Sequence, residues 1–390
     1  ASGQPWPDSA EQFAWLGWAA ALLGSGLCAA WRPDVVHGHD WHTGLAFAYL
    51  RELGRTAEHR PATVFTVHNL AYQGVFSVGL RPRLGLPDAL FHLQGLEFHG
   101  QISFMKAGLK FSDAITTVSP TYAREIMGAE QGCGLEGVLQ QRQDQLHGIL
   151  NGVDDAVWNP RADPLVQPGF DADDLEGKAL AKARLQQRMG LEPRPDALLF
   201  SVVSRLTEQK GLNLLPAVVD DLVQRGGQLA VLGSGDGAIE QALRACARRH
   251  PDQVALTVGY DEALAHGVIA GADVILLPSR FEPCGLTQLY GLRYGTLPLV
   301  RAVGGLADTV VDSSLENLDD GTASGFVFHG FDESALGSAV RRAFALQRRP
   351  AQWRDVQRHA MALRFGWARA AADYLRVYAS VTPAPTAAAA

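Results

Sequence analysis

The sequence has few cysteines, and they lie far apart. Four occur among 390 residues, and none belongs to a C-x-x-C pair; they are Cys28, Cys133, Cys246 and Cys284. A small secreted domain held together by disulfides would need patterned pairs, whereas scattered single cysteines are typical of proteins from a reducing compartment. We therefore expect a cytoplasmic protein without a disulfide framework.

The sequence also has fewer basic than acidic residues. Lys and Arg total 34 against 41 for Asp and Glu, which gives a net charge of −7 and a pI near 5.9. A surface that coats nucleic-acid phosphates needs an excess of basic residues. The composition therefore argues against nucleic acid as a partner, and any bound anion has to be held by a few local basic side chains.

Charged residues are absent from one long apolar stretch, residues 13–31. Its length would allow it to cross a bilayer. However, the stretch contains Gly17, Gly24 and Gly26, and no basic segment precedes it, so it resembles neither a signal peptide nor a well-flanked anchor. We expect instead a buried helix that packs on a sheet, and no membrane partner.

The segment HGHDWH places His37, His39, Asp40 and His42 within six residues. An apolar run leads into it and a helical pattern follows, which predicts a strand-to-helix turn. Because alternate residues of a strand share a face, His37 and His39 should lie together, with His42 apart from them. The regular H-E-x-x-H spacing of zinc hydrolases is missing, so a metal-free polar pocket is favoured over a metal site.

Short apolar runs alternate with longer amphipathic stretches, which predicts an α/β protein with parallel sheets and helical crossovers. The runs that we interpret as further strands are residues 62–67, 114–118, 145–150, 198–203, 228–232, 253–258, 274–277 and 297–300. Between about residues 159 and 177 the chain becomes rich in Pro, Asp and Gly and loses its periodicity, as linkers do. We therefore expect two similar α/β halves that face each other across a cleft.

Two cations follow the strand at residues 198–203, in the segment SRLTEQKG. Arg205 and Lys210 are five residues apart, and a helix is expected to start near Gly211. Two cations and free helix N–H groups on one spot can bind phosphate without a metal ion. The alternative is a solvated basic turn.

The next apolar run is followed by VLGSGDGAIE, in which Gly233, Gly235 and Ala238 fit the G-x-G-x-x-A form of a dinucleotide fingerprint. Asp261 lies near the expected acidic distance, so an NAD-dependent oxidoreductase is one possible function. The motif is weak because it follows the second strand of its domain, whereas the fingerprint follows the first. Glycines that permit close packing are the alternative.

A third segment, PSRFEPCGLTQLYG, follows the strand at residues 274–277. Glu282 stands in its loop, and Gly285, Leu286 and Thr287 open a helix whose N–H groups could hold a second anion. A carboxylate beside an anion site suits recognition of sugar hydroxyls or support of developing positive charge. A structural capping role for Glu282 is the alternative.

Together with FTVHNLAYQG, TTVSPTYAREI, LNGVD, SRLTEQKG and GGLADTV, this segment resembles bacterial glycogen synthases and plant starch synthases that use ADP-glucose. The resemblance runs from about Asp8 to Tyr378. It implies a retaining glycosyltransferase that extends an α-1,4-glucan such as glycogen and needs no cofactor or metal. It also implies two Rossmann-like domains facing across a cleft, the GT-B arrangement.

The resemblance assigns roles to individual residues. Those expected to be catalytic are Glu282, by the donor glucose, His68, which matches a glucose-binding histidine, and the phosphate-binding pair Arg205 and Lys210. Those expected to bind substrate are Asp40 on the acceptor side, Asn151 in the cleft, Tyr260 stacked on adenine, and the loop Cys284, Gly285, Leu286 and Thr287. Related families carry a second glutamate eight positions after the first, where this chain has Tyr290, as expected of this branch.

The family begins with a strand and a K-x-G-G loop, and no K-x-G-G occurs in this chain. We therefore expect an acceptor-side domain over residues 1–160 that lacks its first strands. A linker should follow at 161–177 and a nucleotide-sugar-binding domain at 178–365. We further expect a helix at 366–378 that packs back on the first domain, and a disordered tail at 379–390. A catalytically weak nucleotide- or glucan-binding remnant is thus a third possible function.

Overall fold

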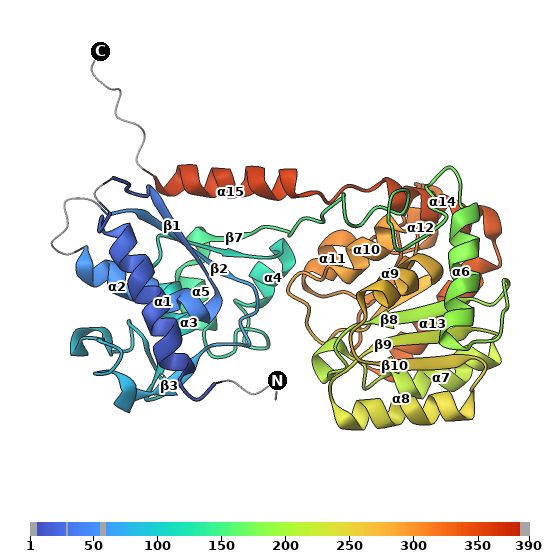
Figure 1. Ribbon diagram of the computed structural model, residues 1–390, viewed down its shortest axis with the longest axis horizontal. Helices are drawn as coiled ribbons and strands as arrows, with labels where there is room; N and C mark the ends of the chain where they lie inside the picture. The colour runs from blue at the N-terminus through green and yellow to red at the C-terminus, as the bar shows by residue number, and fades with distance from the viewer. Residues whose placement is uncertain (1–5, 29, 55–59, 383–390) are drawn as a thin grey trace, which may run out of the picture. The chain divides into compact units, whose positions relative to one another are not determined.

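The structure is a computed structural model that describes residues 6–28, 30–54 and 60–382. The chain forms two compact units, each built around a parallel sheet (Figure 1). Unit 1 comprises Ala1–Leu150 with Ala368–Ala390, and unit 2 comprises Asn151–Trp367. The division at Leu150 comes earlier in the chain than the domain boundary expected at residue 160.

The main sheet of unit 1 has four parallel strands in the order β1-β2-β6-β7. Their bounds are β1 Val35–His39, β2 Ala62–Val67, β6 Ala114–Thr117 and β7 Leu146–Gly148, so the predicted strands in this half are confirmed. Every residue of β2 is buried, as expected for an inner strand of a parallel sheet. Since the strands are parallel, their carboxyl ends meet at one edge, where ligands of such sheets bind.

A second, small sheet of unit 1 was not predicted. Its antiparallel strands are β3 Val75–Ser77, β5 Gln101–Ser103 and β4 Glu97–Phe98, in that order. Strands of two or three residues are too short to show an alternating pattern, so the sequence carries no signal for them. Unit 1 also contains the helices α3 Phe104–Phe111, α4 Pro120–Glu125 and α5 Glu136–Gln141.

The first part of the apolar stretch, residues 13–24, lies in helix α1, Ser9–Gly24. The expected helix is confirmed, but it contacts the sheet chiefly at β1, and its main packing partner is helix α2, Asp40–Leu53. At their crossing a Cβ on Gly17 would lie 2.9 Å from the Ala46 backbone nitrogen, so only glycine fits. Trp15 on the other face is 71% exposed. Among the described residues, no helix is long and apolar enough to cross a membrane.

The sheet of unit 2 has six parallel strands in the order β10-β9-β8-β11-β12-β13. They are β8 Leu199–Val203, β9 Gln228–Gly233, β10 Val254–Val258, β11 Val274–Leu277, β12 Leu297–Arg301 and β13 Phe326–Phe328. The first five match predicted runs, and the three-residue β13 was missed. The α-helices are α6 Glu176–Met189, α7 Leu215–Gln224, α8 Gly237–Arg249, α9 Glu262–Gly271, α10 Thr287–Arg293, α11 Gly304–Thr309, α12 Leu315–Asp319, α13 Glu333–Gln347 and α14 Pro350–Ala362.

Helices cover both faces of this sheet. On strand β8, Leu199 packs in a core with Val268 of α9, while its neighbour Phe200 packs in another core with Val219 of α7. Alternate side chains of a strand point to opposite faces, so β8 supplies both cores. This is the doubly wound arrangement expected from the alternation of strands and helices.

The segment expected to be a linker, residues 161–177, lies inside unit 2 and is anchored there. Asp163, which is fully buried, accepts hydrogen bonds at 2.6 Å from His266 Nδ1 and from the Tyr294 hydroxyl. Val166 and Phe170 are buried as well, and α6 already begins at Glu176. A Pro- and Asp-rich composition predicted irregular structure correctly, but the hydrogen bonds that fix this segment involve residues distant in sequence.

Helix α15, Trp367–Val381, contributes to unit 1. Ala370 and Val377 on this helix are buried together with Val64 and Ala114 of the unit 1 sheet. The helix extends through residue 381, so the first residues of the predicted disordered tail are helical. The rest of that tail, residues 383–390, lies outside the described residues.

Candidate functional site

The predicted site residues form one group in each unit. In unit 1, Asp40 directly follows strand β1, and His68 directly follows strand β2, its parallel neighbour. Asp40 Oδ1 accepts hydrogen bonds from the backbone N–H of His68 at 2.8 Å and of Asn69 at 3.4 Å. Asp40 has a φ of +56°, a left-handed conformation that costs energy for a residue with a side chain. The carboxylate thus ties the ends of the two strands together.

The histidines of HGHDWH divide as the strand geometry predicted. The His37 and His39 rings are stacked with centroids 4.3 Å apart, whereas His42 packs beside Phe13 and Trp41. His37 is held at both ring nitrogens; its partners are the Thr66 hydroxyl at 2.6 Å and the Tyr378 hydroxyl at 2.8 Å. His39 Nδ1 lies 3.1 Å from His68 Nε2. Within the described part of the chain, no group of three or more His, Cys, Asp or Glu is arranged to hold a metal ion.

Unit 1 is expected to lose stability in acid through His37. Burial, reinforced by the neighbouring His39 and His68, lowers the pKa of His37 to about 4 from its ordinary value of 6.5. The unfolded chain therefore binds a proton that the folded chain does not, and stability present above pH 6.5 is lost as the pH falls toward 4. Because the ring is only half-buried, we expect a loss of about 1 kcal/mol, or roughly 3 °C in melting temperature.

Thermal melts between pH 7 and 4 will test this prediction. The variant His37→Gln should show a shallower fall of the melting temperature with pH, and His92→Gln, which changes an exposed histidine of the same unit, should behave as the parent. Equal pH dependence in parent and His37→Gln would contradict the assignment.

In unit 2 an ion pair joins two of the predicted residues. Lys210 Nζ donates a hydrogen bond to Glu282 Oε2 at 2.5 Å, and the Ser279 hydroxyl donates to the same oxygen at 3.1 Å. The Glu282 side chain is only 6% exposed. The two residues meet because strands β8 and β11, whose loops carry them, are neighbours in the sheet. From the sequence alone they belong to separate motifs.

The helix expected to start near Gly211 begins later, at Leu215 of α7. Residues Glu208–Lys210 form a short 3₁₀ helix, and Gly211 ends it with a φ of +68°. A Cβ on Gly211 would lie 1.8 Å from the Pro278 carbonyl oxygen, so the loop backbone rests against the end of β11. The expected N–H groups of the α7 start are therefore not beside Lys210, so the anion site predicted here would depend on the side chains of Arg205 and Lys210 alone.

The loop from Cys284 to Thr287 is fixed from both sides. Helix α10 begins at Thr287 as predicted, and the Gln288 side chain donates to the carbonyls of Cys284 at 3.1 Å and Gly285 at 2.9 Å. The backbone N–H of Asn151 hydrogen-bonds the Cys284 thiol, and burial raises the pKa of that thiol to about 11. Asn151 and the loop, assigned to the site separately, are therefore in contact.

Sequence reasoning missed the role of two adjacent glycines in GGLADTV. A Cβ on Gly304 would lie 1.9 Å from the Glu282 carbonyl oxygen, and one on Gly305 would lie 2.1 Å from that of Cys284. The Gly305 N–H also donates to the Glu282 carbonyl at 3.2 Å. These glycines allow helix α11 to approach the loop and hold it in place. A glycine pair shortly after the end of β12 was the available signal.

Trp158 is a second residue that the sequence did not single out. Its ring stacks on His266 of α9 and on Tyr290 of α10, with centroid distances of 3.9 Å and 3.8 Å. Tyr290 lies one helical turn after Thr287, so the stack fastens the loop-bearing helix α10 to α9. Tyr260 lies just before α9 and is 83% exposed, which leaves its ring open to a ligand.

The geometry removes support for a dinucleotide site at VLGSGDGAIE. A Cβ on Gly233 would lie 1.9 Å from the Ser204 carbonyl oxygen, and one on Gly235 would lie 2.4 Å from that of Leu206. Close packing within the unit therefore accounts for both glycines. Asp261, the expected ribose partner, caps α9 through the Leu264 N–H at 2.8 Å and pairs with Arg188 at 3.1 Å.

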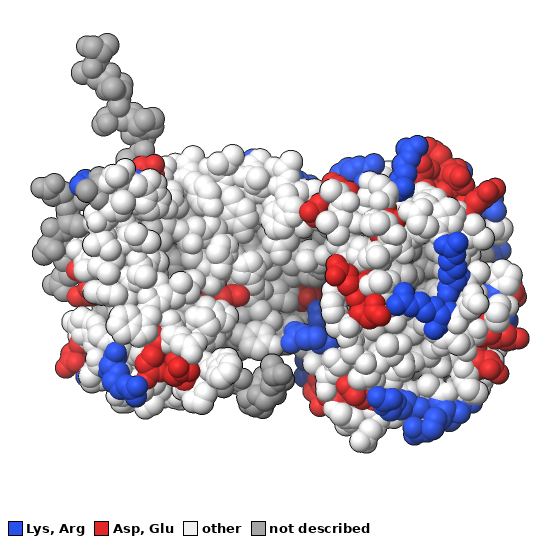
Figure 2. Space-filling view, in the orientation of Figure 1, with Lys and Arg blue, Asp and Glu red and all other residues white. Residues whose placement is uncertain are grey.

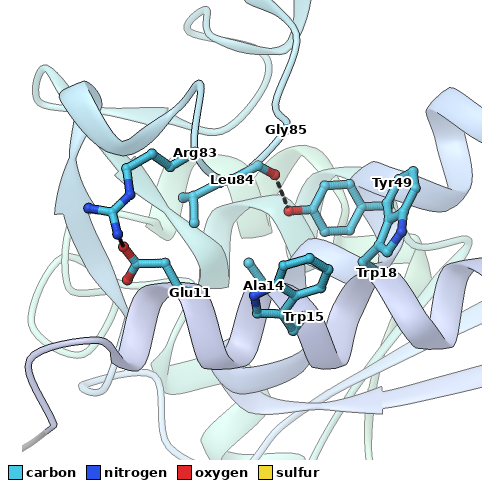
Figure 3. A pocket seen from close by; sticks show the side chains of 8 residues that line it. All are labelled: Glu11, Ala14, Trp15, Trp18, Tyr49, Arg83, Leu84 and Gly85. Carbon is cyan, nitrogen blue, oxygen red and sulfur yellow. Dashed lines mark hydrogen bonds and ion pairs between the residues drawn. The ribbon is translucent and has the colours of Figure 1, made fainter.

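A well-formed pocket in unit 1 contains none of the predicted residues. It encloses about 190 Å³ and is lined by Glu11, Ala14, Trp15, Trp18, Tyr49, Arg83, Leu84 and Gly85 (Figure 3). An ion pair between Arg83 and Glu11 of 2.8 Å closes one side, and the Tyr49 hydroxyl donates to the Leu84 carbonyl at 2.5 Å. The charged side chains and the tyrosine hydroxyl that line it thus already have partners within the protein.

Comparison with known proteins connects both units to one family. Residues 1–141 match the family described as starch synthase catalytic domain, and residues 184–359 match glycosyl transferases group 1. The chain is 60% identical over 381 residues to a glycogen synthase of Albidiferax ferrireducens, covering 98% of this chain and 77% of that protein. With a glycogen synthase of Yersinia enterocolitica the identity is 59% over 373 residues, covering 95% and 78%.

Solved structures give the same result for the fold. The catalytic domain of starch synthase IV from Arabidopsis thaliana, bound to ADP and acarbose, matches with a TM-score of 0.90 and 33% identity, covering 98% of this chain and 79% of that one. A sucrose-phosphate synthase from Thermosynechococcus elongatus matches with a TM-score of 0.58 at 19% identity, covering 91% and 75%, which bears on the fold alone. The predicted fold class, α/β with two Rossmann-like units of the GT-B type, is confirmed.

Proposed function

This chain belongs to the glycogen synthase and starch synthase family of hexosyltransferases, and from that membership we propose that it transfers glucose from ADP-glucose to the non-reducing end of an α-1,4-glucan with retention of configuration. The observation that carries the proposal is the 60% identity with a glycogen synthase over 98% of the chain. The ADP bound to the related starch synthase supports the choice of nucleotide.

We assign the donor to unit 2. Tyr260, whose ring is open, stacks on adenine, and Arg205 and Lys210 bind the diphosphate. The loop Cys284, Gly285, Leu286 and Thr287 receives glucose hydroxyls and phosphate, with Asn151 beside it. The contact of Lys210 with Glu282 supports this assignment, because it places a cation for phosphate directly next to a carboxylate for the sugar.

The chemistry follows from the charges that develop. Breaking the bond between glucose and phosphate leaves positive charge on the sugar ring and negative charge on ADP. Arg205 and Lys210 stabilise the leaving group, and Glu282 faces the positive charge from a buried position where electrostatic effects are strong. In unit 1 we assign His68 to glucose and Asp40 to the acceptor side. These groups require neither a metal ion nor a cofactor.

We further propose a cytoplasmic location and neither nucleic acid nor a membrane as a partner. The scattered cysteines and the net charge of −7 support these assignments. On the visible face of unit 2, Lys and Arg alternate with Asp and Glu among the described residues (Figure 2). A surface of mixed charge does not favour the binding of a polyanion such as nucleic acid.

The direct test is incorporation of labelled glucose into glycogen by the purified chain, with ADP-glucose or UDP-glucose as donor and with or without EDTA. We expect incorporation from ADP-glucose that exceeds that from UDP-glucose and is unaffected by EDTA. ADP binding without any transfer would instead support the binding remnant, and activity lost in EDTA and restored by Mg²⁺ would contradict the charge-based mechanism.

Replacing Tyr260 by alanine is expected to weaken ADP binding 5- to 30-fold. Stacking of a base on an aromatic ring contributes about 1–3 kcal/mol, and we place this exposed ring in the lower part of that range. Because the side chain is 83% exposed, the melting temperature should not change. Calorimetry with ADP gives the affinity, and Tyr260→Phe, which keeps the ring, should bind like the parent. Unchanged affinity in Tyr260→Ala would place adenine elsewhere.

A further inference from the structure

His68 is fixed at two points by residues of the HGHDWH segment. Its backbone N–H donates to Asp40 Oδ1 at 2.8 Å, and its ring Nε2 lies 3.1 Å from His39 Nδ1. A hydrogen bond between two imidazoles requires one ring to donate and the other to accept. The contact with His39 therefore couples the tautomer of His68 to that of His39, and it fixes the direction of the His68 ring.

The His39 ring is itself held in place from strand β1. It stacks on the ring of His37 at 4.3 Å with the two planes 28° apart. His37 is anchored by Thr66 of strand β2 and by Tyr378 of helix α15. Thr66 in turn hydrogen-bonds Thr116 of strand β6 at 2.5 Å. Polar contacts across the sheet, joined by the His37–His39 ring stack, thus end at the ring of His68.

We propose that His39 is a positioning residue for glucose transfer, which holds His68 Nε2 so that His68 Nδ1 is the ring nitrogen presented to the glucose. This inference rests on the proposed function, because it takes His68 to be a glucose-binding residue. His39 does not need to touch the substrate. Its effect is to keep His68 in one tautomer and one orientation.

The surroundings keep the His39 ring neutral near pH 7. Burial and the nearby His68 lower its pKa, while Asp40 acts in the opposite direction. His37, which faces it on the same strand, has a pKa of about 4 and is neutral as well. From helix α15, Tyr374 and Tyr378 face His37. A neutral His39 keeps one donor and one acceptor nitrogen, as the contact with His68 requires.

The test compares His39→Leu, His39→Asn and the control His42→Gln in the full chain. His42 belongs to the same segment, but its ring contacts Trp41 and Phe13 instead of His68. Loss of the hydrogen-bond partner that orients a metal-ligating histidine typically costs 10- to 100-fold, and we take that range for an orienting partner of His68. We expect His39→Leu to lower kcat by that factor with KM for ADP-glucose changed less than threefold. His39→Asn places a polar atom near the position of Nδ1 and should recover part of the loss, and His42→Gln should stay within twofold of the parent.

A spectroscopic measurement separates this inference from the proposed function. The ¹⁵N chemical shifts of the His68 ring report its tautomer, and we expect one tautomer in the parent and a mixture in His39→Leu. This holds even if the chain transfers no glucose, in which case only the proposed function fails. Because His39 keeps much of its surface exposed to solvent, the melting temperature of both variants should stay close to that of the parent. An unchanged tautomer, or a kcat of His39→Leu within twofold of an active parent, would overturn the inference.

Discussion

Replacing Lys210 by methionine is expected to lower glucose transfer at least 100-fold and to destabilise unit 2 by about 2–4 kcal/mol. The loss of stability follows from Glu282, whose side chain is 6% exposed and whose Oε2 accepts the lysine hydrogen bond at 2.5 Å. Without Lys210 the buried carboxylate loses its cationic partner, although among the described residues it still accepts the hydrogen bond from Ser279. An uncompensated buried charge is among the most costly changes that a folded chain can undergo.

The loss of activity has a separate cause. A charge-assisted hydrogen bond to phosphate contributes about 1.5–3 kcal/mol, so ADP should bind 10- to 150-fold more weakly. Turnover should fall further, because negative charge on the leaving group develops during the reaction and the missing cation no longer stabilises it.

A double variant distinguishes the two effects. Adding Glu282→Gln to Lys210→Met removes the unpaired charge, so thermal melting should return close to the parent while ADP affinity and transfer remain low. The single variant Glu282→Gln should bind ADP but turn over slowly. If the double variant is as unstable as Lys210→Met alone, the buried pair is not the cause of the instability, and parental ADP affinity in Lys210→Met would refute the phosphate assignment.

Apart from the three-residue β13, the strands of both main sheets could be predicted because parallel, buried strands are continuous apolar runs. The order of the strands within each sheet could not be predicted. Strand β8 has β9 and β11 as its neighbours, and nothing local to these strands shows that β11 lies beside β8. The pairing of Lys210 with Glu282 depends on that order, so it was beyond a reading of separate motifs. The start of α7 was wrong for a related reason, because the tight approach of Gly211 to Pro278 ends the first helical turn.

The site residues show the same division between local and distant information. A strand-to-helix turn rich in polar residues marked Asp40 as a candidate, whereas His68 was assigned only through the family resemblance. Alternation along the strand placed His37 and His39 on one face. What alternation cannot supply is the partner of each ring, since Tyr378 reaches His37 from the far end of the chain. Trp158 was missed because its stacking partners, His266 and Tyr290, belong to helices more than 100 residues later.

Substitutions at Asp40 should separate its charge from its role in holding the backbone. The residue has a φ of +56°, and its Oδ1 accepts from the N–H groups of His68 and Asn69. Asparagine keeps an acceptor oxygen and tolerates this conformation, glycine tolerates it without an acceptor, and alanine does neither. We therefore expect stability to decrease in the order Asn, Gly, Ala, with Asp40→Ala about 2–3 kcal/mol below the parent.

Activity should not follow the same order. If the carboxylate acts through its charge on the acceptor side, Asp40→Asn will fold like the parent and still lose transfer by about 10²–10³-fold, the usual effect of removing one preorganised charge-stabilising group. Measuring melting temperature and glucose transfer on the three variants gives both quantities independently. The assay with ADP alone provides the control, because unit 2 holds the proposed nucleotide contacts and ADP affinity should be the same in all three. Should Asp40→Asn retain more than half of the parent turnover, Asp40 acts only as a cap for the His68 backbone, and the negative charge assigned to the acceptor side has to come from another residue.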